Sequence, residues 1–90
     1  MTDNSDEHQI FRDLKMLNGL PDDTPQPKII NSEAMKLVFM DPVQRACHIR
    51  GVENHVAGYD KNSNLRSQVQ GRKLIQSLKA TNKKITAAGR

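Results

Sequence analysis

The feature that most limits the fold of this chain is its small supply of large apolar side chains. Isoleucine, leucine, valine and phenylalanine together number 20 of the 90 residues, just above the roughly one-fifth fraction below which highly charged chains stay disordered. A chain of this length forms at most one small domain and buries only about 60% of its unfolded surface. We therefore expect marginal stability that a partner would increase, and a second copy of the chain, in a homodimer, is one candidate.

Charge is segregated along the chain. Residues 1–31 carry a net charge of −3, residues 32–60 carry −1, and residues 61–90 contain eight bases and no acid. A segment of purely positive charge is typical of proteins that bind an acidic macromolecule. The total of +4 hides this division.

Membrane and disulfide-stabilised classes are excluded by simple counts. The longest apolar stretch, residues 37–40, is far shorter than the ~20 residues that cross a bilayer, and the N-terminus is acidic where a signal peptide would be basic and then apolar. The single cysteine, Cys47, cannot form an internal disulfide, in keeping with a reducing compartment. We therefore expect a cytoplasmic protein with no membrane segment.

The acidic N-terminal segment 1–19 is predicted to contain the first helix, over residues 6–18. Ser5 is a good N-cap, and acidic residues follow it in the first turn. The apolar residues recur at helical spacing, and Asn18 with Gly19 supplies a C-terminal stop. The apolar positions are Ile10, Phe11, Leu14 and Leu17. They either complete the core or dock onto a larger protein.

Three prolines occur within residues 20–31, at positions 21, 25 and 27. Proline fixes φ and holds the preceding residue out of the α region. The pattern therefore predicts an extended linker or strap over residues 20–31. Ile29 and Ile30 are too apolar for a free linker, so at least one of them should be buried.

The segment 32–80 is predicted to form the helical core. Asn31 or Ser32 can cap a short helix that ends at Met40, although residues 37–40 equally fit a buried strand. The length of the segment and its cap favour the helix.

Asp41 followed by Pro42 marks the start of the next helix, because proline at the first helical position needs no hydrogen-bond donor. We expect this helix to bend or end at Gly51 before a short helical turn over residues 52–57. Its apolar side is predicted to be Val43, Ala46, Cys47 and Ile49.

Ser63 or Asn64 is expected to cap the last helix, over residues 64–80. Residues 81–90 lack periodicity and are predicted to form a flexible basic tail. The predicted fold class is therefore all-α, a small bundle of about four short helices with an extended Pro-rich segment after the first helix and a flexible basic C-terminal tail.

Basic and polar side chains fall on two stripes of the last helix. The first stripe holds Arg66, Gln70, Lys73, Ser77 and, if the helix continues that far, Lys84, and the second holds Arg72, Lys79 and Lys83. This alternation suits a helix laid along a phosphate backbone, with Gln70 or Gln68 contacting base edges. The alternative is an ordinary solvated face. The absence of acids over residues 61–90 favours binding, because ordinary helices intersperse both signs of charge.

Two apolar residues of the last helix do not lie on the same face as its other apolar residues. Leu65 and Val69 lie between the two basic stripes, whereas Leu74, Ile75 and Leu78 share the opposite face. The helix must therefore bend near Gly71, or another helix or chain must cover its first two turns.

A helix-turn-helix unit around Gly51 fits poorly, because Arg50 falls where a buried apolar residue is required. A looser version would use residues 42–57 as the supporting helix and residues 64–80 as the recognition helix. The basic tail, including Lys83, Lys84 and Arg90, would then act as an arm along the phosphates or in the minor groove.

Single-stranded nucleic acid is a weaker fit than a duplex. The aromatic residues are Phe11, Phe39 and Tyr59, and none lies within the basic cluster, where stacking on unpaired bases would require it. We therefore favour duplex DNA.

Metal and catalytic sites are not predicted. Cys47, His48 and His55 lie within nine residues, but adjacent helical side chains diverge by about 100° and no further ligand completes a zinc site. Cys47 and His48 as a nucleophile and base would need a pocket that so short a chain hardly provides. We expect Cys47 to be a small core residue, and we expect neither enzymatic activity nor a cofactor.

The N-terminal acids have two interpretations. They pair with the basic helix and reduce its affinity for nucleic acid, or they cap the first helix and increase solubility. They are Asp3, Asp6, Glu7, Asp13, Asp22 and Asp23.

The sequence favours a small DNA-binding regulatory or accessory protein that contacts duplex phosphates through its basic C-terminal helix and tail. The alternative is a small adaptor or inhibitor that binds a larger protein complex, through the basic helix or through the first helix. In either case the partner is duplex DNA or another acidic macromolecule, or a protein.

Overall fold

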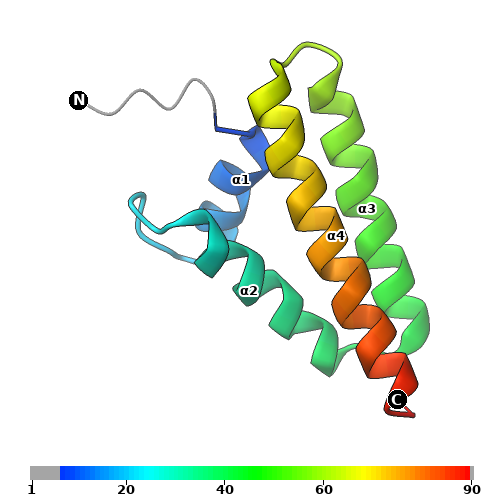
Figure 1. The fold of residues 1–90 in the computed structure, drawn as a ribbon. Coiled ribbons are helices and arrows are strands. Elements are labelled where there is room, and N and C mark those ends of the chain that lie inside the picture. The colour runs from blue at the N-terminus through cyan, green and yellow to red at the C-terminus, as the bar shows by residue number, and fades with distance from the viewer. Residues whose placement is uncertain (1–6, 90) are drawn as a thin grey trace.

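The computed structural model describes residues 7–89 and confirms an all-α bundle (Figure 1). Its elements are α1 (Gln9–Leu17), α2 (Gln26–Lys36), the short 3-10 helix η1 (Leu37–Phe39), α3 (Pro42–Asp60) and α4 (Leu65–Ala87). Within the described range there is no strand, so residues 37–40 do not form one. None of the helices in this range has the length and apolarity needed to cross a bilayer.

Helices α3 and α4 form an antiparallel hairpin, side by side along most of their length (Figure 1). Helix α2 packs against α4, and the shorter α1 packs against α2 and α3. The two long helices do not cross as in a helix-turn-helix unit, so the expectation of residues 42–57 as support and 64–80 as a recognition helix is corrected.

The starts of α3 and α4 are those that the sequence predicts. Asp41 Oδ1 accepts a hydrogen bond from the Gln44 amide at 2.8 Å, and Gln44 Oε1 accepts one from the Asp41 amide at 3.0 Å. This is a complete capping box. At α4, Asn64 Oδ1 accepts from the Ser67 amide at 2.9 Å. Local side-chain chemistry therefore determines both helix starts.

The first helix begins later than predicted. His8 is the N-cap of α1, and its side chain accepts a hydrogen bond from the Ile10 amide at 3.1 Å. The expected cap, Ser5, lies outside the described residues. The predicted stop is confirmed, because Gly19 follows the helix with a φ of +65°, a conformation that glycine adopts without steric cost.

The extended segment predicted over residues 20–31 is wrong in its second half. Helix α2 begins at Gln26, after Pro25 as its N-cap and with Pro27 in its first turn. At these positions proline removes no helical hydrogen bond, because the first amides of a helix have no partner within it. The helix was expected to begin at Asn31 or Ser32, but both residues lie inside α2, which begins earlier. Ile29 is buried, as predicted.

Helix α3 is continuous through Gly51, where a break was expected. Its buried line is Arg45, Ile49, Val52 and Val56. Packing along this line offsets the roughly 1 kcal/mol cost of a helical glycine. The line also differs from the predicted apolar side: Val43, Ala46 and Cys47 are exposed, because a buried arginine takes the core position.

The predicted flexible tail over residues 81–90 is instead helical as far as Ala87. The Arg45 side chain, only 1% exposed, donates from Nε to Asn82 Oδ1 at 2.7 Å and from Nη1 to the Met40 carbonyl at 2.8 Å. Ile85 packs against the core. Contacts distant in sequence therefore hold these residues, and periodicity within the tail could not show them.

The core is one cluster to which every helix contributes. Its buried apolar residues are Ile10, Phe11, Leu14, Ile29, Leu37, Ile49, Val52, Val56, Leu74 and Leu78. Because α1 supplies three of them, its apolar stripe belongs mainly to the core, and Leu17 is left exposed.

Gly71 lies at a close approach of α4 to α3 and to the N-terminus of α1. A Cβ added there would lie 2.7 Å from Val56 Cγ1 and 3.1 Å from the His8 ring. Real Cβ contacts are not this short, so the site requires glycine. By contrast, a Cβ at Gly51 or Gly58 would meet nothing within 4 Å.

We predict that Gly71→Ala destabilises the fold, although alanine is the better helix former. Overpacking costs about 1–3 kcal/mol, which exceeds the gain in helix propensity of about 1 kcal/mol, so the net loss is roughly 1 kcal/mol. The matched control Gly51→Ala should raise the stability by about 0.5–1 kcal/mol. Chemical denaturation of both variants measures whether each substitution raises or lowers the free energy of unfolding. Equal stabilisation by both would contradict the packing at Gly71.

Candidate nucleic-acid interface

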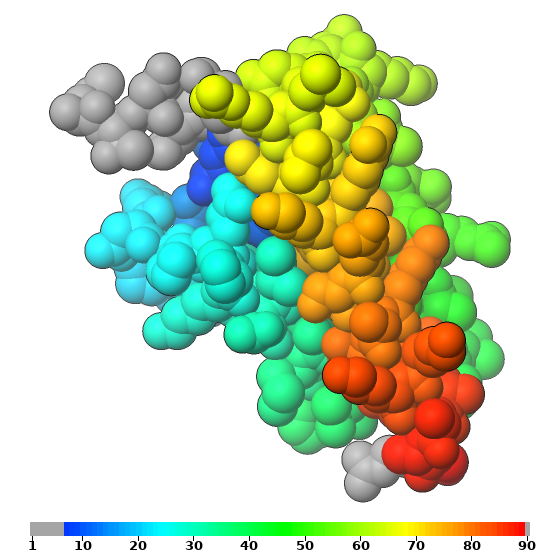
Figure 2. Space-filling model, in the orientation of Figure 1, coloured from blue at the N-terminus to red at the C-terminus, as the bar shows by residue number. Residues whose placement is uncertain are grey.

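Helix α4 has one buried line and a broad exposed face. Ser67, Gly71, Leu74 and Leu78 are buried and occur at the i, i+4, i+7 spacing of one helical stripe. The opposite side runs uncovered across the molecule between the α2 region and α3 (Figure 2, yellow to red). We call this side the outer face of α4.

The outer face carries the six basic residues of the two predicted stripes, while Arg90 of the predicted arm lies outside the described residues. Arg66, Arg72, Lys73, Lys79, Lys83 and Lys84 are all exposed. Helix α4 contains no acid. On α3, Glu53 Oε2 lies 2.9 Å from Lys79 Nζ, and both side chains are partly exposed. The face is therefore positively charged along its whole length.

The uncharged polar residues predicted near the nucleic acid are less exposed than the basic ones. Gln70 is half-buried, and its Oε1 accepts a hydrogen bond from the His8 amide at 2.8 Å. Ser77 is also half-buried. Gln68 Nε2 donates to the carbonyls of Asp60 and Ser63, each at 3.2 Å. Both amides that were expected near base edges thus hold α4 to the rest of the fold.

The line between the two stripes is uncharged and open. Leu65 is 75% exposed and Val69 is 46% exposed, and α4 passes through Gly71 as one continuous helix. Neither the predicted bend nor a covering helix occurs in the described chain. Gln76 and Ala80 are exposed on the same line. In the sequence, the position of Leu65 and Val69 between the two basic stripes already indicated this line. The sequence analysis did not identify Gln76 as part of it.

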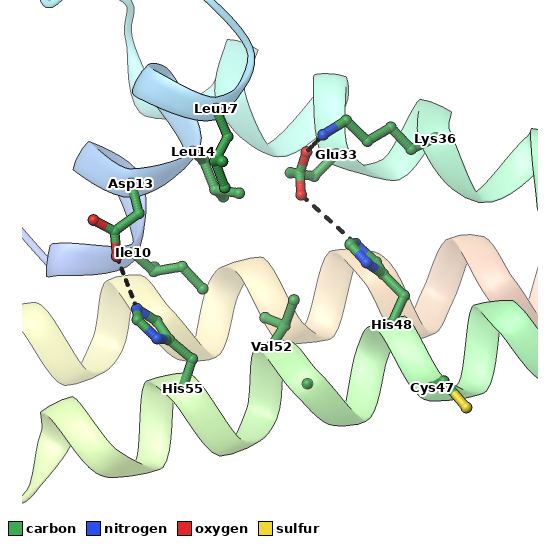
Figure 3. Close-up of a pocket in the computed structure, with 11 residues that line it drawn as sticks. Ile10, Asp13, Leu14, Leu17, Glu33, Lys36, Cys47, His48, Val52 and His55 are labelled. Carbon is green, nitrogen blue, oxygen red and sulfur yellow. Dashed lines mark ion pairs between the residues drawn. The ribbon is translucent and has the colours of Figure 1, made fainter.

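A second surface feature is an open groove of about 370 Å³ between α1, α2 and α3 (Figure 3). Ile10, Leu14, Leu17 and Val52 form its apolar part. At one end, His55 Nε2 lies 3.1 Å from Asp13 Oδ2.

At the other end of the groove lies Glu33, a carboxylate that is only 1% exposed. Its Oε2 accepts from Lys36 Nζ at 2.7 Å and from Asn18 Nδ2 at 3.2 Å. His48 Nε2 lies 3.6 Å from Glu33 Oε1, which is beyond hydrogen-bond distance, and this buried nitrogen has no hydrogen-bond partner. The groove therefore has a histidine and a carboxylate at each end.

The ionisable side chains of this groove do not gather into a cluster of metal ligands within the described range. Among residues 7–89, no three His, Cys, Asp or Glu side chains are close enough together to hold a metal ion. The Cys47 sulfur is exposed and points away from the His48 ring (Figure 3). The expectation that Cys47 is a core residue is therefore wrong.

Two of the N-terminal acids engage α1 and α3. Glu7 lies 3.2 Å from Lys15 Nζ and 3.6 Å from Arg12 Nε, and Asp13 pairs with His55. These contacts stabilise α1 and its packing. Asp22 and Asp23 lie in the exposed loop between α1 and α2, and Asp3 and Asp6 lie outside the described residues.

His8 connects α1 to the hairpin and is fully buried. Its Nδ1 accepts from the Ile10 amide, so Nε2 carries the proton of the neutral ring and donates to Asp60 Oδ1 at 3.2 Å. The Tyr59 ring lies against it, with centroids 4.4 Å apart. Burial lowers the pKa of His8, an effect that the Asp60 carboxylate partly opposes and that nearby His55 reinforces.

No protein-family model, curated protein or solved structure matches the chain.

We predict that His8 makes the fold less stable in mild acid. Its pKa is lowered in the folded state, so the unfolded chain binds more protons below the ordinary value near 6.5, and the stability falls as pH decreases through this window. Protonated Nδ1 also cannot accept from Ile10. The contribution is fully present above pH 6.5.

The measurement compares the wild type with His8→Asn, which keeps an N-cap, by denaturation between pH 8 and pH 5. Every other residue is identical in the two proteins, so the difference between them isolates His8. The wild type should lose more stability than the variant over this range. A parallel decline of both proteins would refute the role of His8.

Proposed function

We propose that this protein is a small DNA-binding regulatory or accessory protein that contacts duplex phosphates through the outer face of α4. The observation that carries the proposal is the set of six exposed cations on a helix without acids. From Arg66 to Lys84 the cations span about 27 Å at 1.5 Å per residue. A solvated face alone would not require one sign of charge over this length.

Duplex DNA fits this face because its charge is dense and continuous. The duplex carries one negative charge per ~1.7 Å of its axis, and each phosphate that a lysine or arginine neutralises releases condensed counterions. The cations are held on a rigid helix that is packed against α2 and α3. The backbone that carries the cations therefore need not rearrange when the face meets a polyanion.

A second candidate is an adaptor or inhibitor that binds a larger protein. The observation that favours it is the exposure of large apolar residues around η1, where Phe39 is 85% exposed and Met35 and Val43 are also uncovered. Binding through helix α1 is less favoured, since most of its apolar stripe is buried. A pull-down from nuclease-treated extract distinguishes the candidates, because only a protein complex would survive the treatment.

We predict that the double variant Lys73→Ala/Lys84→Ala weakens duplex DNA binding and lowers its salt dependence. Each lost phosphate contact should reduce the slope of log K against log salt by about 0.9, so the double variant should lose about 2. Fluorescence titrations of a labelled duplex at several salt concentrations measure the slope.

The matched control is Lys28→Ala/Lys61→Ala, which removes the same charge from exposed positions on α2 and the α3–α4 loop. It should leave most of the slope intact. An equal loss in both double variants would place the contact elsewhere, and wild-type protein without salt-sensitive duplex binding would refute the proposed function.

We further predict that Glu53→Gln strengthens duplex binding. Glu53 is the carboxylate beside Lys79, and its removal frees that cation and removes a charge that repels phosphates. We expect an increase of a few-fold at low salt, measured by the same titration. Asp23→Asn, in the exposed α1–α2 loop, removes the same charge and should have a smaller effect. A larger increase from Asp23→Asn would argue against contact through this side of α4.

A further inference from the structure

The outer face of α4 consists of three parallel lines, and the middle one is uncharged. After the exposed Leu65 at its N-terminal end, this middle line continues through Val69, Gln76 and Ala80, and all three are exposed. At 3.6 residues per turn they fall within about 40° of one another, with the two basic stripes roughly 50–60° to either side. The face thus presents cations on both flanks and short or amide side chains between them.

This cross-section matches the chemistry of the DNA major groove. The groove is about 12 Å wide and admits an α-helix, with one phosphate backbone along each edge and base edges at its floor. Flanking cations would meet both backbones. Val69 and Ala80 are short enough to let the helix approach the floor, whereas long charged side chains there would hold it away.

Gln76 is the side chain of the middle line that can form directional hydrogen bonds. Its amide offers a donor and an acceptor, the pair that binds adenine N6 and N7, and the methyl groups of Val69 and Ala80 suit the thymine methyl. Val69 and Ala80 are about 16 Å apart along α4, a length of four to five base pairs at 3.4 Å each. No described hydrogen bond engages the Gln76 amide, unlike those of Gln68 and Gln70.

We infer that α4 lies in the major groove of duplex DNA with Val69, Gln76 and Ala80 toward the base edges, and that Gln76 gives the protein a preference for A·T pairs. The inference rests on the proposed function and adds to it the groove, the orientation and the residue that determines specificity. Duplex RNA is a poor partner for the same face, because its major groove is deep and narrow.

The test is selection of bound sequences from a pool of randomised duplex DNA, followed by affinity measurements on the selected duplex and on a shuffled duplex of equal length. Gln76→Ala should weaken binding to the selected duplex by roughly tenfold and leave the shuffled duplex unchanged. Alanine is the better helix former and position 76 is exposed, so the variant should remain folded, which circular dichroism checks.

The control Asn54→Ala removes an exposed amide from α3 and should change neither affinity. Salt-sensitive binding that selects no sequence, or that responds equally to Gln76→Ala on both duplexes, would overturn the inference and leave the proposed function standing. The same holds for equal affinity toward duplex RNA of matched sequence. Absence of salt-sensitive binding to any duplex would overturn both.

Discussion

The arrangement of the helices depends on the close approach of α3 and α4 at Gly71. A Cβ at that position would overlap Val56 and crowd the His8 ring, so glycine lets the hairpin close without strain and leaves room for the buried histidine. His8 in turn caps α1 and contacts Asp60 near the end of α3. One small residue on α4 therefore determines how the hairpin packs and where α1 begins.

This packing gives α4 one face in the core and another that is exposed. Its small and apolar residues meet α2, η1 and α3, and the sides that remain carry the cations. A helix shared in this way is rigid because the core holds it. The proposed contact with a duplex would use that rigidity, because a helix that the core already holds adds no backbone ordering to the cost of binding, and only its side chains lose freedom at the phosphates.

The acidic partners of the histidines could not be predicted from the spacing of residues in the sequence. Each of the three faces a carboxylate on a different element: His8 with Asp60, His48 with Glu33 and His55 with Asp13. His48 and His55 are seven residues apart on the continuous α3, so they lie on similar faces of that helix. Their acidic partners lie 15 and 42 residues away in the chain, where spacing carries no information.

The sequence alone determined the helix starts at Asp41 and Asn64, the stop at Gly19 and the separation of charge, because these depend on neighbouring residues and on composition. Only the tertiary structure decided that Gly51 lies within a helix, that Arg45 is buried and holds Asn82, and that Gln76 is exposed while Gln70 binds α1. Such outcomes depend on residues that meet only after the chain has folded. The free energy of packing between distant segments outweighs the weak local preferences on which sequence patterns rest.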